Sequence, residues 1–262
     1  MGVNPTQAEP TWLTSWTRTL NEPEAGILLD AAVPGDQVDA WAARGEEVLP
    51  QASRDRRREL LRIVRDELLD LADGRIVDTA FLRLFRGGSP HRRKGLLWGR
   101  LLARRPLVEP ALHALIVPAL AASDVPLAPL DSDRIDAAAW DTWLRSILRP
   151  GIPPEALRKT RTTLQGGLAA VGVLQIEGNA IRITRVTHAE PDPLAWAWTL
   201  ADELARGGGE TDEARALRDS FAARLFGTRR EYGMACLEAG ISAGLLRRSY
   251  LAGIPRLLLG ER

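Results

Sequence analysis

The chain has very few cysteines and lysines. Its single cysteine, Cys236, excludes an internal disulfide and a cysteine-rich metal site. Only two of its 35 basic residues are lysines, Lys94 and Lys159, so nearly all of its positive charge is arginine. No apolar run approaches the roughly 20 residues of a bilayer-spanning helix, and the polar first residues lack the apolar stretch of a signal peptide. We therefore expect a cytoplasmic protein that does not contact a membrane.

Signatures of catalysis are also missing from the sequence. The three histidines, His91, His113 and His188, are far apart and lack the spacing of metal ligands. The chain has no Walker-type phosphate loop, no GxGxxG motif and no serine nucleophile elbow. These absences predict a protein that is not an enzyme and that needs no cofactor or metal.

The composition favours helix over sheet, because Leu and Ala are abundant while Val, Ile, Tyr and Phe are sparse. We predict a mainly α fold, a helical bundle that contains a winged-helix-like helix–hairpin unit and possibly a second one in the C-terminal tail. The expected regions are an N-terminal helical region at 1–150, a winged-helix-like module plus the following helix at 151–206, and a helix–hairpin tail at 210–262. The triple glycine at 207–209 is the expected boundary before the tail.

Two helices in the N-terminal region have predicted caps. Ser53 is expected to cap a helix that runs to about Ala72, with leucines at helical spacing opposite a row of arginines. Asp131 or Asp133 is expected to cap a helix that carries Trp140, which we place in the core.

The stretch from Pro154 to Arg185 carries the winged-helix pattern. A helix over Pro154 to Val171 is followed by the apolar run Val173 to Ile176, a Glu177-Gly178-Asn179 turn and a second, alternating run. The tail after the triple glycine has a related order of elements. Two interpretations of this likeness stay open: a weak internal repeat, and chance similarity in a chain rich in Leu, Ala and Gly.

Charge is segregated along the chain, although the formal net charge is only +1. Residues 83–105 hold eight basic side chains and no acidic one, and residues 158–185 hold five basic side chains and one acidic one. A local positive field is what sequence-independent binding to phosphates requires. The alternative is that these cations are solvated or pair with the acidic segments in the fold.

The predicted recognition helix has an apolar face formed by Leu157, Leu164, Leu168 and Val171. Its remaining polar side chains are of types that contact bases and phosphates, and two arginines of the second strand flank the expected wing. The residues predicted to form the main nucleic-acid contact surface are Arg158, Lys159, Arg161, Thr162, Gln165, Arg182 and Arg185. The residues predicted to form a second phosphate track are Arg92, Arg93, Lys94, Arg100, Arg104 and Arg105.

An FLRLF element (81–85) lies before a basic helix, and a T-x-x-x-L…L-x-x-x-G-x-L helix ending and a short hairpin follow it. In this order of elements the chain resembles the BrxA family of BREX phage-defence systems. The resemblance covers about 180 residues, in Gly26 to Leu71, Thr79 to Leu120 and Trp140 to Leu204, and the tail departs from shorter family members. It implies a mostly helical, non-enzymatic DNA-binding component of a multi-gene defence system.

The leading hypothesis is therefore a non-enzymatic accessory protein of a bacterial phage-defence system. Its expected partners are double-stranded DNA and other components of that system. Two alternatives remain: an adaptor that scaffolds defence enzymes through protein contacts, and a winged-helix transcriptional repressor, which is expected to be a homodimer on a palindromic site.

Overall fold

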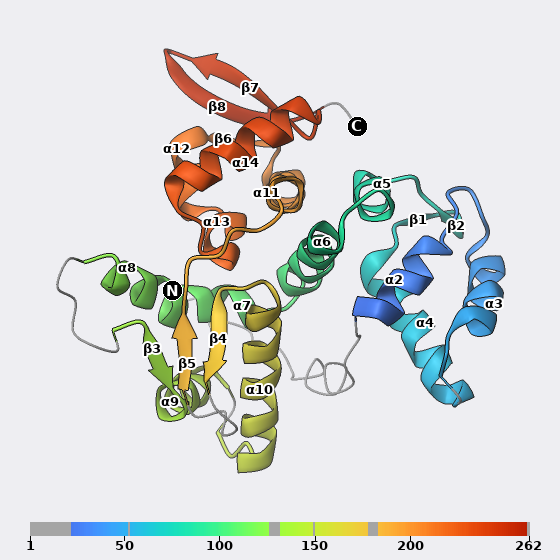
Figure 1. Ribbon diagram of the computed structural model, residues 1–262, viewed down its shortest axis with the longest axis horizontal. Helices are drawn as coiled ribbons and strands as arrows, with labels where there is room; N and C mark the ends of the chain where they lie inside the picture. Colours follow the sequence, from blue (N-terminus) through green and yellow to red (C-terminus); the bar gives the residue numbers. More distant parts are fainter. Residues whose placement is uncertain (1–21, 52, 126–131, 149, 178–182, 261–262) are drawn as a thin grey trace, which may run out of the picture.

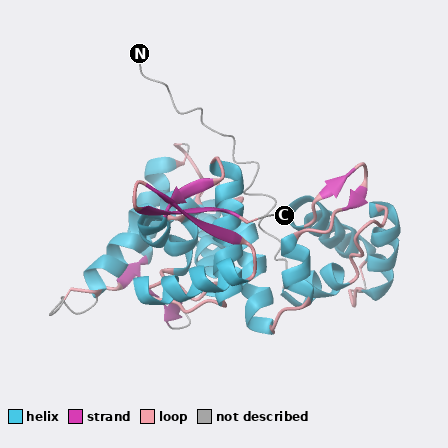
Figure 2. Ribbon diagram, turned by 90° about the horizontal axis from the view of Figure 1, so that it is seen from above, coloured by secondary structure: helices cyan, strands magenta, loops and turns pink. Residues whose placement is uncertain are grey.

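The computed structural model describes residues 22–51, 53–125, 132–148, 150–177 and 183–260. Helices make up most of the described chain, and its strands form small two- and three-stranded sheets (Figure 2). The predicted mainly α class is confirmed.

The N-terminal helices form a lobe around Trp41. The fully buried indole donates a hydrogen bond to the carbonyl oxygen of Leu28 at 2.9 Å. Ser53 caps the third helix of the lobe as predicted, because its hydroxyl accepts from the backbone N–H of Arg56. The elements of the lobe are α2 (Glu22–Asp30), α3 (Val38–Val48), α4 (Arg54–Leu68), β1 (Leu71–Ala72), β2 (Arg75–Ile76), α5 (Ala80–Arg86) and α6 (Pro90–Ala103).

A first helix–strand–helix–helix–hairpin unit follows the lobe. Its three antiparallel strands lie in the order β3-β5-β4, so the strand that precedes the helix pair joins the edge of the hairpin. Inside it, the indole of Trp140 donates to Thr184 Oγ1 at 3.1 Å and ties a helix to the sheet. The elements of this first unit are α7 (Val108–Ala111), η1 (Leu112–Ile116), α8 (Val117–Ser123), β3 (Arg134–Asp136), α9 (Ala137–Ile147), α10 (Pro154–Ala170), β4 (Leu174–Glu177) and β5 (Ile183–Val186).

The C-terminal part forms a second unit with a related order of elements, in which three helices instead of two separate the first strand from the hairpin. Its strand order, β6-β8-β7, matches that of the first unit position by position. The two hairpins point to opposite ends of the molecule, β4–β5 downward and β7–β8 upward in Figure 1. The elements of this second unit are α11 (Pro193–Gly207), β6 (Glu210–Asp212), α12 (Glu213–Asp219), α13 (Phe221–Phe226), α14 (Arg230–Ser242), β7 (Leu246–Leu251) and β8 (Ile254–Leu259).

Two local predictions are corrected. The helix expected to reach Ala72 ends at Leu68, because Asp73 and Gly74 form a tight turn with φ of +51° and +72°. The helix that carries Trp140 is capped by Asp136, whose carboxylate accepts from the N–H of Ala139 at 2.7 Å. Asp131 lies outside the described residues, and Asp133 lies just before β3. Three-residue strands such as β3 are too short to show a periodicity in the sequence.

The expected regional boundaries fall inside the two units. Residues 134–147 precede the predicted module at 151, yet β3 pairs with β5 of the same sheet. The triple glycine forms the turn between α11 and β6, and α11 packs against α13 and α14 of the tail. Residues 193–207 therefore pack with the C-terminal tail in the structure.

Helices α6 and α11 cross at close range and join the lobe to the rest of the molecule (Figure 1). A Cβ atom at Gly95 would lie 2.8 Å from the Cβ atom of Ala195, and one at Gly99 would lie 2.6 Å from Thr199 Oγ1. Contacts this short leave no room for a side chain, so the two glycines set the approach of the helices. Because α11 packs this closely against α6, Trp198 of α11 belongs to the hydrophobic core of the lobe.

Within the described residues, no single helix is both long and apolar enough to span a bilayer. The one combination that passes by length and composition is α6 with the segment Val108–Ser123, and these are bent by 100° relative to each other.

Candidate nucleic-acid interface

The outer face of α10 presents exposed polar side chains at helical spacing. Glu155, Arg158, Lys159, Thr162 and Gly166 are all exposed and recur every three or four residues, so they lie along one side of the helix. Among the described residues, none forms an ion pair with Arg158 or Lys159. Both cations are therefore available to an anionic partner.

Two residues predicted for this surface lie on the opposite side of α10. Arg161 is 9% exposed and Gln165 is 1% exposed, so neither is placed to touch DNA directly. Positions 161 and 165 share the side of the helix that also carries the buried Leu157, Leu164 and Leu168, because they follow them at helical spacing. The expectation that every polar side chain of this helix lies on its surface is therefore wrong for these two.

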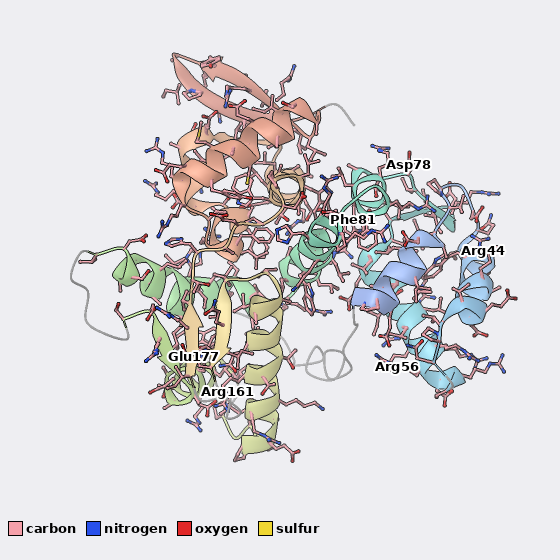
Figure 3. All side chains as sticks on the ribbon, viewed as in Figure 1. Arg44, Arg56, Asp78, Phe81, Arg161 and Glu177 are labelled. Carbon is pink, nitrogen blue, oxygen red and sulfur yellow. The ribbon has the colours of Figure 1, made fainter. Side chains whose placement is uncertain are left out.

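Arg161 instead fastens α10 to α9 (Figure 3). Its Nη1 atom lies 2.8 Å from Asp141 Oδ1 and donates to the carbonyl oxygen of Ala137 at 3.3 Å. An arginine can stay charged inside a protein when a nearby carboxylate balances its charge and a carbonyl accepts one of its hydrogen bonds. Arg161 is thus a positioning residue for the helix pair.

The structure describes one of the two arginines predicted to flank the wing. Arg182 lies outside the described residues. Arg185 is exposed on β5, but its Nε atom donates to Asp133 Oδ2 at 2.5 Å across the sheet. Its charge is therefore already compensated by a neighbouring carboxylate.

Most of the second basic block is neutralised within the fold. Arg92 pairs with Asp192 at 3.0 Å, Arg93 with Asp30 at 2.8 Å, Arg100 with Asp70 at 2.7 Å, and Arg105 with Glu67. Arg104 is exposed and donates to the carbonyl oxygen of Asp66, while Lys94 is exposed and has no ion pair among the described residues. Four of the six cations of the predicted phosphate track thus form internal ion pairs, because carboxylates distant in sequence fold onto them.

Arg100 is the most deeply buried cation of this block. Its side chain is sandwiched against Phe81 and Trp198, with the guanidinium carbon 4.7 Å and 5.9 Å from the two ring centres. It also donates to the carbonyl oxygen of Glu67 at 3.1 Å. The residue is only 3% exposed, so its role is to hold α4, α6 and α11 together.

Replacing Arg100 with Ala is expected to lower the free energy of unfolding by about 2–4 kcal/mol, because the change removes charged hydrogen bonds and leaves a cavity. The exposed Arg104→Ala variant is the matched control, with a change within about 0.5 kcal/mol. Urea unfolding followed by circular dichroism checks both. An Arg100→Ala variant as stable as the parent chain, with weaker DNA binding, would restore the phosphate-track interpretation.

The second unit does not repeat the basic face of the first. Gly172 follows the last turn of α10 and Gly244 follows the last turn of α14, with φ of +90° and +71°, which places equivalent residues 72 positions apart. The residues of α14 that match Arg158, Lys159, Thr162 and Gly166 are Arg230, Glu231, Met234 and Glu238. Two cations on α10 are thus replaced by one cation and two carboxylates, which repel phosphate.

Other sites for chemistry are sparse in the part of the chain that the structure describes. No group of three or more His, Cys, Asp or Glu side chains there could hold a metal ion. A cavity of about 230 Å³ is lined by Arg104, Arg105 and Glu203, among others. Burial raises the pKa of Glu203, whose carboxylate accepts from the backbone N–H of Phe221 at 2.7 Å. This carboxylate therefore has a structural partner.

No family model, curated protein or solved structure matches the chain. The functional interpretation therefore rests on the geometry of the two units and on their surface charges.

Proposed function

We propose that the chain binds double-stranded DNA through the outer face of α10, within a winged-helix unit that spans residues 108–186. The element order and the β3-β5-β4 strand order support this proposal, because they are the orders expected of a winged helix, in which the second helix of the pair enters the major groove. The observation that carries the proposal is the exposed pair Arg158 and Lys159, which has no ion-pair partner among the described residues.

The chemistry of this face suits a nucleic acid. Arg158 offers a planar fork for guanine or phosphate, and Lys159 offers a mobile point charge for phosphate. Both lie in the first half of α10, which is the part of a recognition helix that reaches base edges. Gly166 leaves open space further along the same face, with no atom within 4 Å of a Cβ placed there. A phosphate backbone can therefore approach the helix closely.

The cellular setting comes from the resemblance to the BrxA family. It favours a non-enzymatic accessory component of a bacterial phage-defence system, in which larger proteins carry the chemistry. Co-purification with the products of neighbouring genes tests this setting separately from DNA binding.

A salt-dependent mobility-shift assay tests the DNA proposal. Affinity for duplex DNA is expected to fall steeply as salt rises from about 50 mM to about 200 mM, because each neutralised phosphate contributes a slope of about 0.9 in log K against log salt. A duplex that is not retarded at about 50 mM salt would refute the proposal.

A protein-interaction adaptor is the second candidate function. It is favoured by the exposed apolar tip of the β7–β8 hairpin, which projects from the second unit (Figure 1). Stable association with another protein in the absence of DNA affinity would select this candidate.

A further inference from the structure

The β7–β8 hairpin carries the most exposed large apolar side chains among the described residues. Tyr250 is 70% exposed, Leu251 is 60% exposed and Ile254 is 57% exposed. They surround a two-residue turn in which Ala252 and Gly253 have φ of +50° and +82°. A left-handed alanine is uncommon, so the tight, apolar tip is held in a defined shape at some conformational cost.

Two of the three arginines of the hairpin are engaged by carboxylates, which makes the tip less suited to phosphate. Arg248 contacts Glu213 at 2.7 Å and Glu238 at 2.6 Å. Arg256 contacts Glu210 at 3.0 Å and Asp212 at 3.6 Å. An apolar tip in which two of three arginines are compensated fits a protein surface better than a nucleic acid.

Strand β7 is also an open edge. In the part of the chain that the structure describes, the order β6-β8-β7 leaves one side of its six residues, Leu246–Leu251, without a neighbouring strand. The strand contains no proline, and Arg247 is its only exposed charge, so little protects the edge against pairing with another strand.

We propose that this edge pairs with β7 of a second copy of the chain, antiparallel, with Ser249 opposite Ser249 of the second copy. The two sheets then join as one six-stranded sheet, and the exposed apolar side chains of both tips are buried along the joint. The proposal does not depend on DNA binding, since it involves the second unit alone.

Avoidance of like charges opposite each other selects this register. Side chains alternate between the two faces of a strand, so only registers that pair residues of the same face are allowed. A pairing centred on position 248 would place Arg248 opposite Arg248 of the second copy, and one centred on position 247 would place Arg247 opposite Arg247. Like charges directly opposite each other destabilise both pairings. Centring on Tyr250 engages fewer strand residues, because the turn begins at Ala252.

Centring on Ser249 brings unlike groups together. Arg248 lies across from Tyr250 of the second copy, where a guanidinium can stack on the aromatic ring. Arg247 lies across from Leu251 of the second copy, so its aliphatic stem covers an apolar side chain. Five residues of each strand pair, and no like charges face each other.

A cysteine placed at the centre tests the register directly. Opposite residues of antiparallel strands have Cα atoms about 4.5–5.5 Å apart, within the range of a disulfide. The only native cysteine, Cys236, is buried, and burial raises the pKa of its thiol to about 12. Cys236 is therefore not expected to form a competing disulfide in this assay. Ser249→Cys is expected to give a covalent dimer under mild oxidation, visible on a non-reducing gel.

Arg247→Cys is the register control. In the proposed pairing, the two copies of position 247 are four residues apart along the strand, about 13 Å, which is too far for a disulfide. A dimer from Ser249→Cys but not from Arg247→Cys supports the proposal. Equal crosslinking of both variants, or of neither, overturns it.

Sedimentation of the full chain provides a second measurement. The parent chain is expected to sediment as a dimer, and Leu251→Asp is expected to weaken the dimer by at least about tenfold, because the carboxylate would be buried beside an apolar edge. Ile176→Asp, on β4 of the first unit and 42% exposed in the parent, is the matched control and leaves the dimer intact. A parent chain that is a monomer at micromolar concentration, including one that dimerises only with a different protein, overturns the proposal.

Discussion

Reversing the two free charges of α10, with Arg158→Glu and Lys159→Glu together, is expected to weaken binding to duplex DNA roughly 100-fold at about 50 mM salt. Two lost phosphate contacts lower the slope of log K against log salt by about 1.8, and this slope accounts for the loss at low salt. Both side chains are exposed and unpaired within the described structure, so the variant is expected to unfold like the parent chain. Mobility shift across a salt series measures both quantities.

The second unit supplies a control of equal charge change. Arg229 and Arg230 are adjacent, exposed and located at the start of α14, as Arg158 and Lys159 are located early in α10. Arg229→Glu with Arg230→Glu is expected to leave DNA affinity unchanged beyond a small effect of net charge. A loss as large as that of the α10 variant would show that both units bind DNA, or that net charge alone governs retention.

The second large effect is on stability. Arg161→Glu is expected to lower the free energy of unfolding by about 3 kcal/mol, because it breaks a largely buried ion pair and places a carboxylate beside Asp141. For a chain of this length, such a loss lowers the melting temperature by about 6–12 °C. Arg161→Met retains the apolar stem against α9 and is expected to lose less than half as much. Calorimetry or thermal circular dichroism checks both variants.

This experiment separates a positioning role from a contact role. If Arg161 positions α10, the loss of DNA binding by Arg161→Glu follows the melting temperature and is recovered in part by Arg161→Met. A variant that melts like the parent chain but no longer binds DNA would mean that Arg161 faces the ligand, as the sequence pattern predicts.

The family resemblance and the charge pattern of the sequence predict more contact residues than the structure leaves exposed and unpaired. Of the arginines in the two basic blocks, Arg158 stays available on α10, whereas Arg161 and Arg100 are buried beside carboxylates from other elements. Nothing near these arginines in sequence marks the difference, because the partners Asp141 and Asp70 lie 20 and 30 residues away. Helical spacing offers a partial signal for Arg161, since it shares a side with Leu157 and Leu164.

The second unit shows the same division between local and distant information. The sequence indicates α14 and the turn at Gly253, and it leaves the repeat as one of two interpretations. The matching strand orders of the two sheets favour a repeated unit over chance, since β6 and β3 join the same position of each sheet. These three-residue strands carry no periodicity, so their pairing is decided by the backbone of β5 and β8.

The sequence by itself determined the helical class, the limits of α10 and its hairpin, and the positions of the two basic blocks, because these depend on local propensity, capping and composition. Only the tertiary structure decided which of the cations remain at the surface. An arginine is buried or exposed according to whether a distant carboxylate folds against it, since burying the charge alone costs far more than burying the pair. The binding face that we propose is therefore defined by the two cations of α10 that the fold leaves without a partner among the described residues.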